Sequence, residues 1–213
     1  MQSRLNEGLV KVLQRVALVP VLTIGEGDDA VGLARALTEG GLHVLEITLR
    51  TKVALGAIAA IAKEVPEALV GAGTVLDPEQ GNEAIRAGAR FLVSPGMTPR
   101  LLEAAERWPV GFLPGAATAS EAMALSDLGY QVLKFFPAEP AGGVAALKAL
   151  AAPLPHLRFC PTGGIDAAKA PSYLALPNVV CVGGSWVSPA GAVAAQDWQT
   201  VARLAREAAG LKP

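Results

Sequence analysis

The stretch "GYQVLKFFPAE" (residues 129–139) has the composition of a β-strand, yet a lysine lies in the middle of its apolar run. A strand sends alternate side chains to opposite faces, so Lys134 shares one face with Val132 and Phe136. One face of this strand therefore carries an amine among apolar side chains. Because an ammonium group would lose its hydration there, we expect Lys134 either to lie at a wet edge or to have a chemical use.

Seven further β-rich runs occur along the chain and alternate with alanine-rich helical segments. The eight expected strands cover residues 17–24, 42–49, 68–73, 90–95, 110–115, 131–137, 157–162 and 178–184. The expected helices between them include residues 28–39, 54–64, 78–88, 98–107, 118–128 and 142–151. Most of these segments begin near Asp, Thr, Ser or Pro, and several end at Gly, as helix caps require. Eight parallel strands with crossover helices predict an α/β fold, the (β/α)₈ TIM barrel.

Both ends of the chain are expected to be helical. The amphipathic segment 197–210 predicts a final helix with Asp197 as its N-cap, and residues 3–15 predict an extra helix before the first strand. The run "LTIGEGDDA" (22–30) does not complete the glycine pattern of a dinucleotide-binding open sheet. Because no linker or charge block divides the sequence, residues 1–213 are expected to form a single domain.

The composition predicts a large core and argues against a polyanionic partner. Hydrophobic residues make up 52% of the chain and charged residues 17%, which argues against disorder. The net charge is −1 and the pI is near 6.1, so the basic character typical of nucleic-acid or anionic-membrane binding is missing. The uncharged stretch 170–196 is broken by prolines and a Gly-Gly pair, which argues against a membrane span.

Cysteine usage and the first twenty residues favour a cytoplasmic location. Cys160 and Cys181 lie in apolar runs, without the spacing of a zinc site or a disulfide framework. We interpret both as buried free thiols in a reducing compartment. The charges at Arg4, Glu7 and Lys11 interrupt the apolar segment that a signal peptide would need.

A carboxylate and a guanidinium share one face of the second expected strand. In "LHVLEITLR" (42–50), Glu46 and Arg50 are four residues apart and so point the same way. The catalytic residues of parallel barrels lie at the C-terminal ends of the strands, where this pair is placed. Taken alone, the pattern fits an internal ion pair as well as a catalytic role.

Lys134 is a candidate nucleophile beside this carboxylate and guanidinium. An amine in a largely apolar barrel loses hydration in its charged form, and the neutral amine can attack a ketone to give a Schiff base. The alternative is a structural lysine paired with Glu46, whose long side chain extends toward water.

Two glycine pairs follow the last two expected strands, in "CPTGGI" (160–165) and "VGGSW" (182–186). Adjacent glycines at a strand-to-helix turn leave backbone N–H groups free to point at an anion, and these two loops are a recurrent phosphate site in barrels. One such pair is more often only a tight turn. Two in succession, with Thr162 and Ser185 as hydroxyl donors, indicate a phosphorylated substrate.

Seven runs of the chain resemble one known family, the 2-keto-3-deoxy-6-phosphogluconate (KDPG) aldolases, also called bifunctional KDPG/KHG aldolases. The runs are "VLEITLRT" (44–51), "VGAGTVL" (70–76), "SPGMT" (94–98), "LPGAATASE" (113–121), "KFFPAE" (134–139), "RFCPTGGI" (158–165) and "VGGSW" (182–186). They follow in order with nearly unbroken spacing from the first strand to the last helix. The resemblance implies a homotrimer of (β/α)₈ barrels that acts as a class I aldolase without metal or other cofactor.

The reaction that the resemblance implies is the cleavage of 2-dehydro-3-deoxy-6-phosphogluconate to pyruvate and glyceraldehyde 3-phosphate in the Entner–Doudoroff pathway. The family's site residues fall on positions that match its motifs. They are Lys134 as the Schiff-base lysine, Glu46 as the general acid/base acting through a bound water, Arg50 and Thr74 on the pyruvate carboxylate, Pro95 and Phe136 around the pyruvate, and Thr162, Gly163, Gly164, Gly184 and Ser185 at the phosphate end.

One departure and three alternatives remain at this point. Ala116 and Ala117 stand where relatives often carry bulkier or more polar residues, so the aldehyde preference could shift. One alternative is an aldolase of the same family that prefers 4-hydroxy-2-oxoglutarate or a sugar epimer. A phosphosugar-binding barrel without catalysis would use the glycine loops and leave Lys134 structural. A metal-dependent aldolase is disfavoured because His43 and His156, the two histidines, lack a nearby carboxylate pattern.

Overall fold

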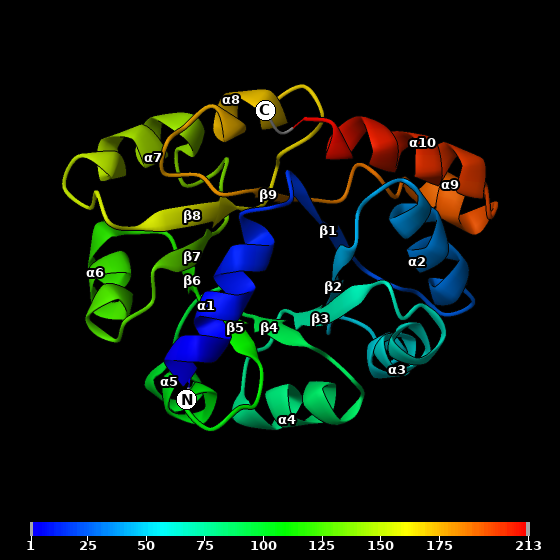
Figure 1. The fold of residues 1–213 in the computed structure, drawn as a ribbon, viewed down its shortest axis with the longest axis horizontal. Helices are drawn as coiled ribbons and strands as arrows, with labels where there is room; N and C mark the ends of the chain where they lie inside the picture. The colour runs from blue at the N-terminus through cyan, green and yellow to red at the C-terminus, as the bar shows by residue number, and fades with distance from the viewer. Residues whose placement is uncertain (1, 212–213) are drawn as a thin grey trace.

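The computed structural model describes residues 2–211, with side chains from Asn6 onward. Strands and helices alternate along most of the chain (Figure 1). The strands are β1 (Leu18–Leu22), β2 (Val44–Thr48), β3 (Leu69–Gly73), β4 (Phe91–Val93), β5 (Gly111–Leu113), β6 (Gly115–Ala116), β7 (Val132–Phe135), β8 (Arg158–Pro161) and β9 (Val182–Gly184). The helices are α1 (Gln2–Leu13), α2 (Ala30–Glu39), α3 (Ala54–Glu64), α4 (Pro78–Arg86), α5 (Pro99–Ala105), α6 (Ala119–Asp127), α7 (Gly143–Ala151), α8 (Ala170–Leu174), α9 (Ala190–Ala194) and α10 (Trp198–Ala209).

Each of the eight expected strands contains a strand of the structure, but one is divided. The expected strand at 110–115 is interrupted at Pro114, which separates β5 from β6. Proline has no N–H group to donate to a ladder, so a strand of this kind is interrupted there. The two helices α8 and α9 were not predicted, because five residues are too few to show a helical period.

All the strand pairs are parallel, and together they form a barrel-like α/β fold. One sheet has the order β5-β4-β3-β2-β1-β9, and a second has the order β6-β7-β8. The two sheets meet at two places. At the first, β6 follows β5 directly along the chain. At the second, bridges join Thr162 to Gly183 and Phe159 to Val179. Helices α2 to α10 lie around the outside of the strands, and α1 lies across one end of them (Figure 1).

The apolar core has two layers, as the period-two pattern of the strands predicts. Leu45 and Leu133 belong to the layer between the strands and the outer helices. Val44 and Val132, one residue earlier in each strand, belong to an inner layer, which Leu13 of α1 also joins. Because Glu46 and Lys134 lie two residues beyond these inner valines, their side chains point into the barrel.

In the part of the chain that the structure describes, five helices begin at a side-chain cap, which fixes where each strand-to-helix loop ends. The capping side chains accept hydrogen bonds from backbone N–H groups in the first turn, and they are Asp29, Asp77, Thr98, Thr118 and Asp197. The prediction for Asp197 is therefore confirmed. A cap of this kind contributes about 1 kcal/mol.

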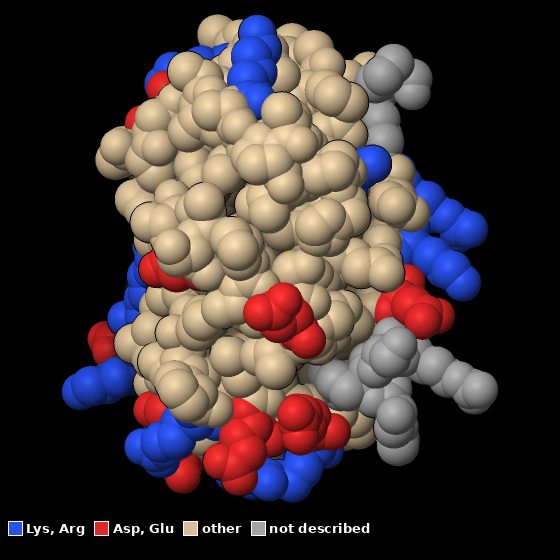
Figure 2. Space-filling view, turned by 90° about the vertical axis from the view of Figure 1, so that its left-hand side faces the viewer, with Lys and Arg blue, Asp and Glu red and all other residues tan. Residues whose placement is uncertain are grey.

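The face formed by α6 and α7 carries few charges (Figure 2). Helix α7 has one charged residue, Lys148. Met123 in α6 and Leu128 just after it are 55% and 57% exposed, so large apolar side chains reach solvent here. No helix within residues 2–211 is both long enough and apolar enough to cross a membrane.

Candidate active site

Lys134 and Glu46 meet inside the barrel. Lys134 lies on β7 and Glu46 on β2, and the Lys134 Nζ donates a hydrogen bond of 3.1 Å to the Glu46 Oε1. The two residues are 4% and 3% exposed, so both charged groups are buried. The period-two prediction of inward faces is confirmed for both, and the wet-edge alternative for Lys134 is wrong.

Gly73, at the end of β3, makes room for the Glu46 carboxylate. A Cβ atom at Gly73 would lie 2.0 Å from the Glu46 Oε1, far inside van der Waals contact. Any side chain here would displace the carboxylate from its place beside Lys134. Sequence reasoning did not single out this glycine. The signal available was its inward position in "VGAG", beside the strand that carries Glu46.

A cavity of about 180 Å³ opens above this pair, at the C-terminal ends of the strands. Seven predicted site residues line it: Arg50, Phe136, Thr162, Gly163, Gly164, Gly184 and Ser185. Lys134 is connected to the cavity through Phe136, because its Nζ lies 5.4 Å from the centre of that ring. The amine therefore lies below the cavity, in cation–π contact with one of its walls.

Four lining residues were missed by the sequence reasoning: Val21, Thr23, Ile165 and Gly183. Val21 and Thr23 follow the buried inner residue Val19 at intervals of two, so strand alternation could have found them. The Thr23 Oγ1 lies 2.9 Å from the Thr48 Oγ1, which joins this side of the cavity to β2. Gly183 is packed against Thr162, whose Oγ1 would lie 2.2 Å from a Cβ at Gly183.

Arg50 and Thr74 form a second polar pair at the cavity. The exposed Arg50 side chain lines it, and the Arg50 Nε donates to the Thr74 Oγ1 at 3.2 Å. Thr74 has a φ of 57°, a region that β-branched residues rarely adopt. Strain of this kind is found mainly at functional sites.

Pro95, like Lys134, Glu46 and Thr74, is a predicted site residue that does not line this cavity. It follows β4, and its carbonyl oxygen would lie 2.2 Å from a Cβ at Gly115. Gly115 is the residue that pairs with Lys134 between β6 and β7. Pro95 therefore packs one strand away from the amine.

The loop after β8 turns sharply beside the cavity. Gly163 and Gly164 have φ angles of 107° and 79°, which favour glycine at both positions. Within residues 2–211, no protein group accepts a hydrogen bond from the backbone N–H of Gly163, Gly164 or Ile165. The loop therefore offers three donors beside the cavity, in the arrangement that suits an anion.

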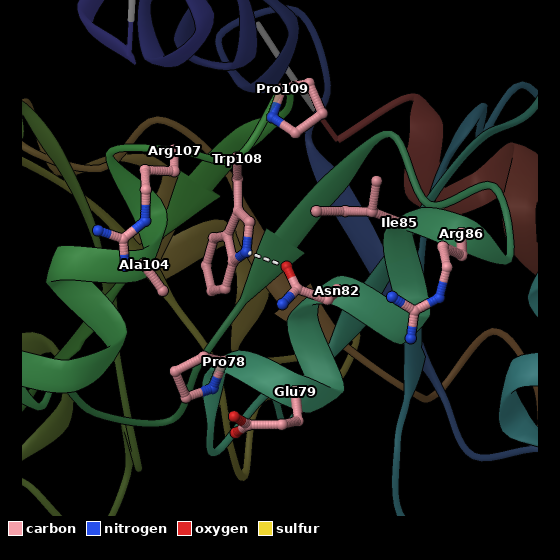
Figure 3. A pocket seen from close by; sticks show the side chains of 9 residues that line it. All are labelled: Pro78, Glu79, Asn82, Ile85, Arg86, Ala104, Arg107, Trp108 and Pro109. Atoms are coloured by element: carbon pink, nitrogen blue, oxygen red, sulfur yellow. Dashed lines mark hydrogen bonds between the residues drawn. The ribbon is translucent and has the colours of Figure 1, made fainter.

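A larger cavity of about 460 Å³ lies on the outside, between α4 and α5. Figure 3 shows Trp108 and Asn82 joined across it by a hydrogen bond, 2.9 Å long, with Arg86 and Arg107 on opposite sides. None of the predicted site residues lines this cavity. The chemistry is therefore assigned to the smaller cavity above Lys134.

Neither the cysteines nor the histidines contribute to the site. Cys160 and Cys181 are buried, as predicted, and within residues 2–211 neither belongs to a disulfide; their sulfur atoms lie 3.5 Å apart. His43 is exposed, and the His156 Nε2 lies 2.9 Å from the Ser126 Oγ at the surface. In the part of the chain that the structure describes, no three His, Cys, Asp or Glu residues gather in a group able to hold a metal ion.

Comparison with known proteins identifies the family of this chain. A family profile described as KDPG and KHG aldolase matches residues 9–204. The KHG/KDPG aldolase of Escherichia coli (strain K12) is 52% identical over 197 residues, which are 92% of each chain.

Solved structures of similar proteins point to the same family. The KDPG aldolase from Legionella pneumophila, with pyruvate captured at low pH as a covalent carbinolamine intermediate, has a TM-score of 0.91 and 44% identity over 94% of this chain and 97% of that one. The 2-keto-3-deoxy-6-phosphogluconate aldolase of Zymomonas mobilis ZM4 with 3-phosphoglycerate has a TM-score of 0.89 and 48% identity over 95% of this chain and 96% of that one. This chain belongs to the KDPG and KHG aldolase family.

Proposed function

We propose that this chain is a class I aldolase, an aldehyde-lyase that cleaves 2-dehydro-3-deoxy-6-phosphogluconate to pyruvate and glyceraldehyde 3-phosphate in the Entner–Doudoroff pathway. The observation that carries the proposal is the buried contact of 3.1 Å between the Lys134 Nζ and the Glu46 Oε1, below a glycine-lined cavity. The family and the names of its members support the same reaction.

The reaction needs an electron sink, which the amine of Lys134 supplies. Its nitrogen attacks the C2 carbonyl, and loss of water gives a protonated imine. Removal of the C4 hydroxyl proton then breaks the C3–C4 bond, and the electron pair moves into the imine to form an enamine. Glyceraldehyde 3-phosphate leaves at this point. Protonation of C3 and addition of water to the imine release pyruvate and restore the amine.

Glu46 is the group placed to move these protons. An ammonium group has no lone pair, so Lys134 must first lose a proton, and the contact of 3.1 Å gives that proton a direct path to Glu46. The same carboxylate, acting through a bound water, takes the proton from the C4 hydroxyl and later supplies one to C3. One group thus serves both half-reactions.

The remaining site residues bind the two ends of the substrate. Arg50 and Thr74 hold the pyruvate carboxylate, while Pro95 and Phe136 shape the pyruvate pocket. The phosphate at the other end is bound by the two glycine loops, through Thr162, Gly163, Gly164, Gly184 and Ser185. The hydrogen bond between Arg50 and Thr74 and the glycine lining of the cavity support this division.

The assembly that we propose is a cytoplasmic homotrimer in which residues 1–213 form a single closed (β/α)₈ barrel domain. The bridges between the two sheets support closure of the barrel, and the exposed Met123 and Leu128 support contact between subunits. The partner is a small phosphorylated keto acid, with no metal or other cofactor and no nucleic acid or membrane.

4-Hydroxy-2-oxoglutarate is a second substrate for the same residues. The observation that favours it is the name of the Escherichia coli relative, a KHG/KDPG aldolase. The small side chains of Ala116 and Ala117 also leave the aldehyde preference open to change.

An assay that couples pyruvate formation to lactate dehydrogenase tests the proposal. Both substrates are supplied, with and without EDTA. We expect pyruvate from 2-dehydro-3-deoxy-6-phosphogluconate at a rate that EDTA leaves unchanged. Ligand binding without pyruvate would instead identify a non-catalytic phosphosugar-binding barrel, and loss of activity in EDTA would identify a metal-dependent aldolase.

A further inference from the structure

Glu139 lies at the centre of a polar network on the outer side of the glycine loop after β8. Its Oε1 accepts a hydrogen bond from the hydroxyl of Tyr173, a residue of α8 that is 1% exposed. Its Oε2 pairs with the Lys169 Nζ at 2.9 Å, and the same ammonium donates to the Gly164 carbonyl at 2.9 Å. None of these three side chains lines the cavity above Lys134.

The backbone around Glu139 holds the same loop. The Ala138 N–H donates to the Thr162 carbonyl at 2.8 Å, and the Glu139 N–H donates to the Gly163 carbonyl at 3.1 Å. With the bond from Lys169 to Gly164, the carbonyls of three consecutive residues, 162 to 164, are all bound from one side.

This anchoring sets the direction of the loop's donors. In a trans peptide the C=O and N–H bonds point in opposite directions. The N–H groups of Gly163, Gly164 and Ile165 share peptide units with the three anchored carbonyls, so they point away from the network. Gly163, Gly164 and Ile165 all line the cavity.

Close packing limits where the Glu139 side chain can lie. A Cβ at Gly164 would be 2.9 Å from the Glu139 Cβ and 2.8 Å from its Cγ. A Cβ at Gly143 would be 3.0 Å from the Tyr173 hydroxyl and 3.2 Å from the Glu139 Oε1. The carboxylate is thus held between two glycines, with Tyr173 and Lys169 as its partners.

We propose that Glu139, Tyr173 and Lys169 are positioning residues, which hold the carbonyls of residues 162–164 outward so that three backbone N–H groups bind the substrate phosphate. The inference rests on the proposed function, because it concerns the phosphate end of the same cavity. It assigns the network to recognition of the phosphate and not to the chemistry at Lys134.

The test compares Lys169→Met and Tyr173→Phe with the parent enzyme. Lys169 is exposed, so its variant folds even if the buried Tyr173 does not tolerate change. Lys169→Arg can restore both bonds and is the rescue variant. Lys148→Met removes an exposed lysine of α7 and is the matched control for charge.

Three quantities are measured for each variant: kcat and KM for 2-dehydro-3-deoxy-6-phosphogluconate, the Kd for inorganic phosphate by calorimetry, and the pyruvate concentration that gives half-maximal borohydride trapping. We expect KM and the phosphate Kd to rise about tenfold in Lys169→Met and Tyr173→Phe, as for one hydrogen bond to a charged group. In these two variants, kcat and the pyruvate concentration for half-maximal trapping should stay within about twofold of the parent values. Lys169→Arg should restore the parent KM and phosphate Kd, and Lys148→Met should leave both unchanged.

Two results would overturn the inference: an unchanged phosphate Kd in both variants, or losses in pyruvate trapping as large as those in phosphate binding, which would mark a purely structural network. If the proposed function itself is wrong, the result differs from both of these. The parent enzyme would then release no pyruvate, while the phosphate Kd still reports on the loop.

Discussion

Lys134 and Glu46 are 88 residues apart in the chain, yet their charged groups lie 3.1 Å from each other inside the barrel. Burying such a pair costs several kcal/mol of desolvation for each ion, and apolar residues of the same volume are often as stable or more so. A gain in folding stability therefore does not explain well why two charged residues are buried here. Proton transfer between the two groups gives a better one, since it yields the neutral amine that attacks a ketone.

Replacing Glu46 by Gln separates proton transfer from imine formation. Gln keeps the shape of the side chain but cannot accept a proton, so we expect kcat to fall by roughly 10²–10⁴. Pyruvate should still be trapped on the enzyme by borohydride, although more slowly, because Lys134 must then lose its proton to water. The coupled lactate dehydrogenase assay and mass spectrometry of the reduced adduct measure the two steps. Unchanged turnover would remove Glu46 from its role.

Gly73→Ala tests the room that Glu46 requires. The added methyl would meet the Glu46 Oε1 at 2.0 Å and move the carboxylate away from Lys134. We expect kcat to fall at least tenfold. Gly56→Ala is the matched control, because a Cβ there, in helix α3, meets nothing within 4 Å. That variant should keep its kcat and gain up to about 1 kcal/mol of stability. Equal kcat values for the two variants would contradict the steric argument.

Arg50→Lys tests recognition of the carboxylate. A guanidinium can bind a carboxylate through two parallel hydrogen bonds, whereas an ammonium acts as a point charge. The bond from the Arg50 Nε to Thr74 also fixes the direction of the guanidinium. We expect KM to rise about tenfold for both 2-dehydro-3-deoxy-6-phosphogluconate and 4-hydroxy-2-oxoglutarate, since both carry this carboxylate. A rise for one substrate only would place Arg50 at another part of the molecule.

Glu139 gives a prediction about stability and pH. The Tyr173 hydroxyl, and then Lys169, hold the pKa of Glu139 below its ordinary value of 4.5, against burial and Asp166, which raise it. A pKa that is lower in the folded state means that ionised Glu139 adds stability above the unfolded value and loses it as pH falls through the folded value. The difference in unfolding free energy between the parent and Glu139→Gln should therefore be constant from pH 7 to about pH 5, and shrink below about pH 4. Urea unfolding across this range measures it, and a difference that grows in acid would contradict the sign.

Most of what could be predicted from the sequence came from the alternation of side chains between the two faces of each strand. It placed Lys134 and Glu46 on inward faces, because inward and outward residues of a parallel strand differ by one position. The distance between the two charged groups could not be predicted from the alternation, because it depends on how the barrel closes across strands that are not neighbours.

The features that were missed are those that depend on tertiary contacts. Gly73 matters only because the Glu46 carboxylate occupies the space where its side chain would be. Glu139 was part of a quoted motif, but its partners Tyr173 and Lys169 come from the unpredicted helix α8 and the loop before it. Pro114 divides a strand that looked continuous by its apolar pattern.

Sodium borohydride reduction in the presence of pyruvate, followed by peptide mass spectrometry, shows whether Lys134 forms the Schiff base. We expect one adduct, on Lys134, and neither adduct nor turnover in Lys134→Ala. An adduct on any other lysine, or pyruvate release by Lys134→Ala, would contradict this role of Lys134.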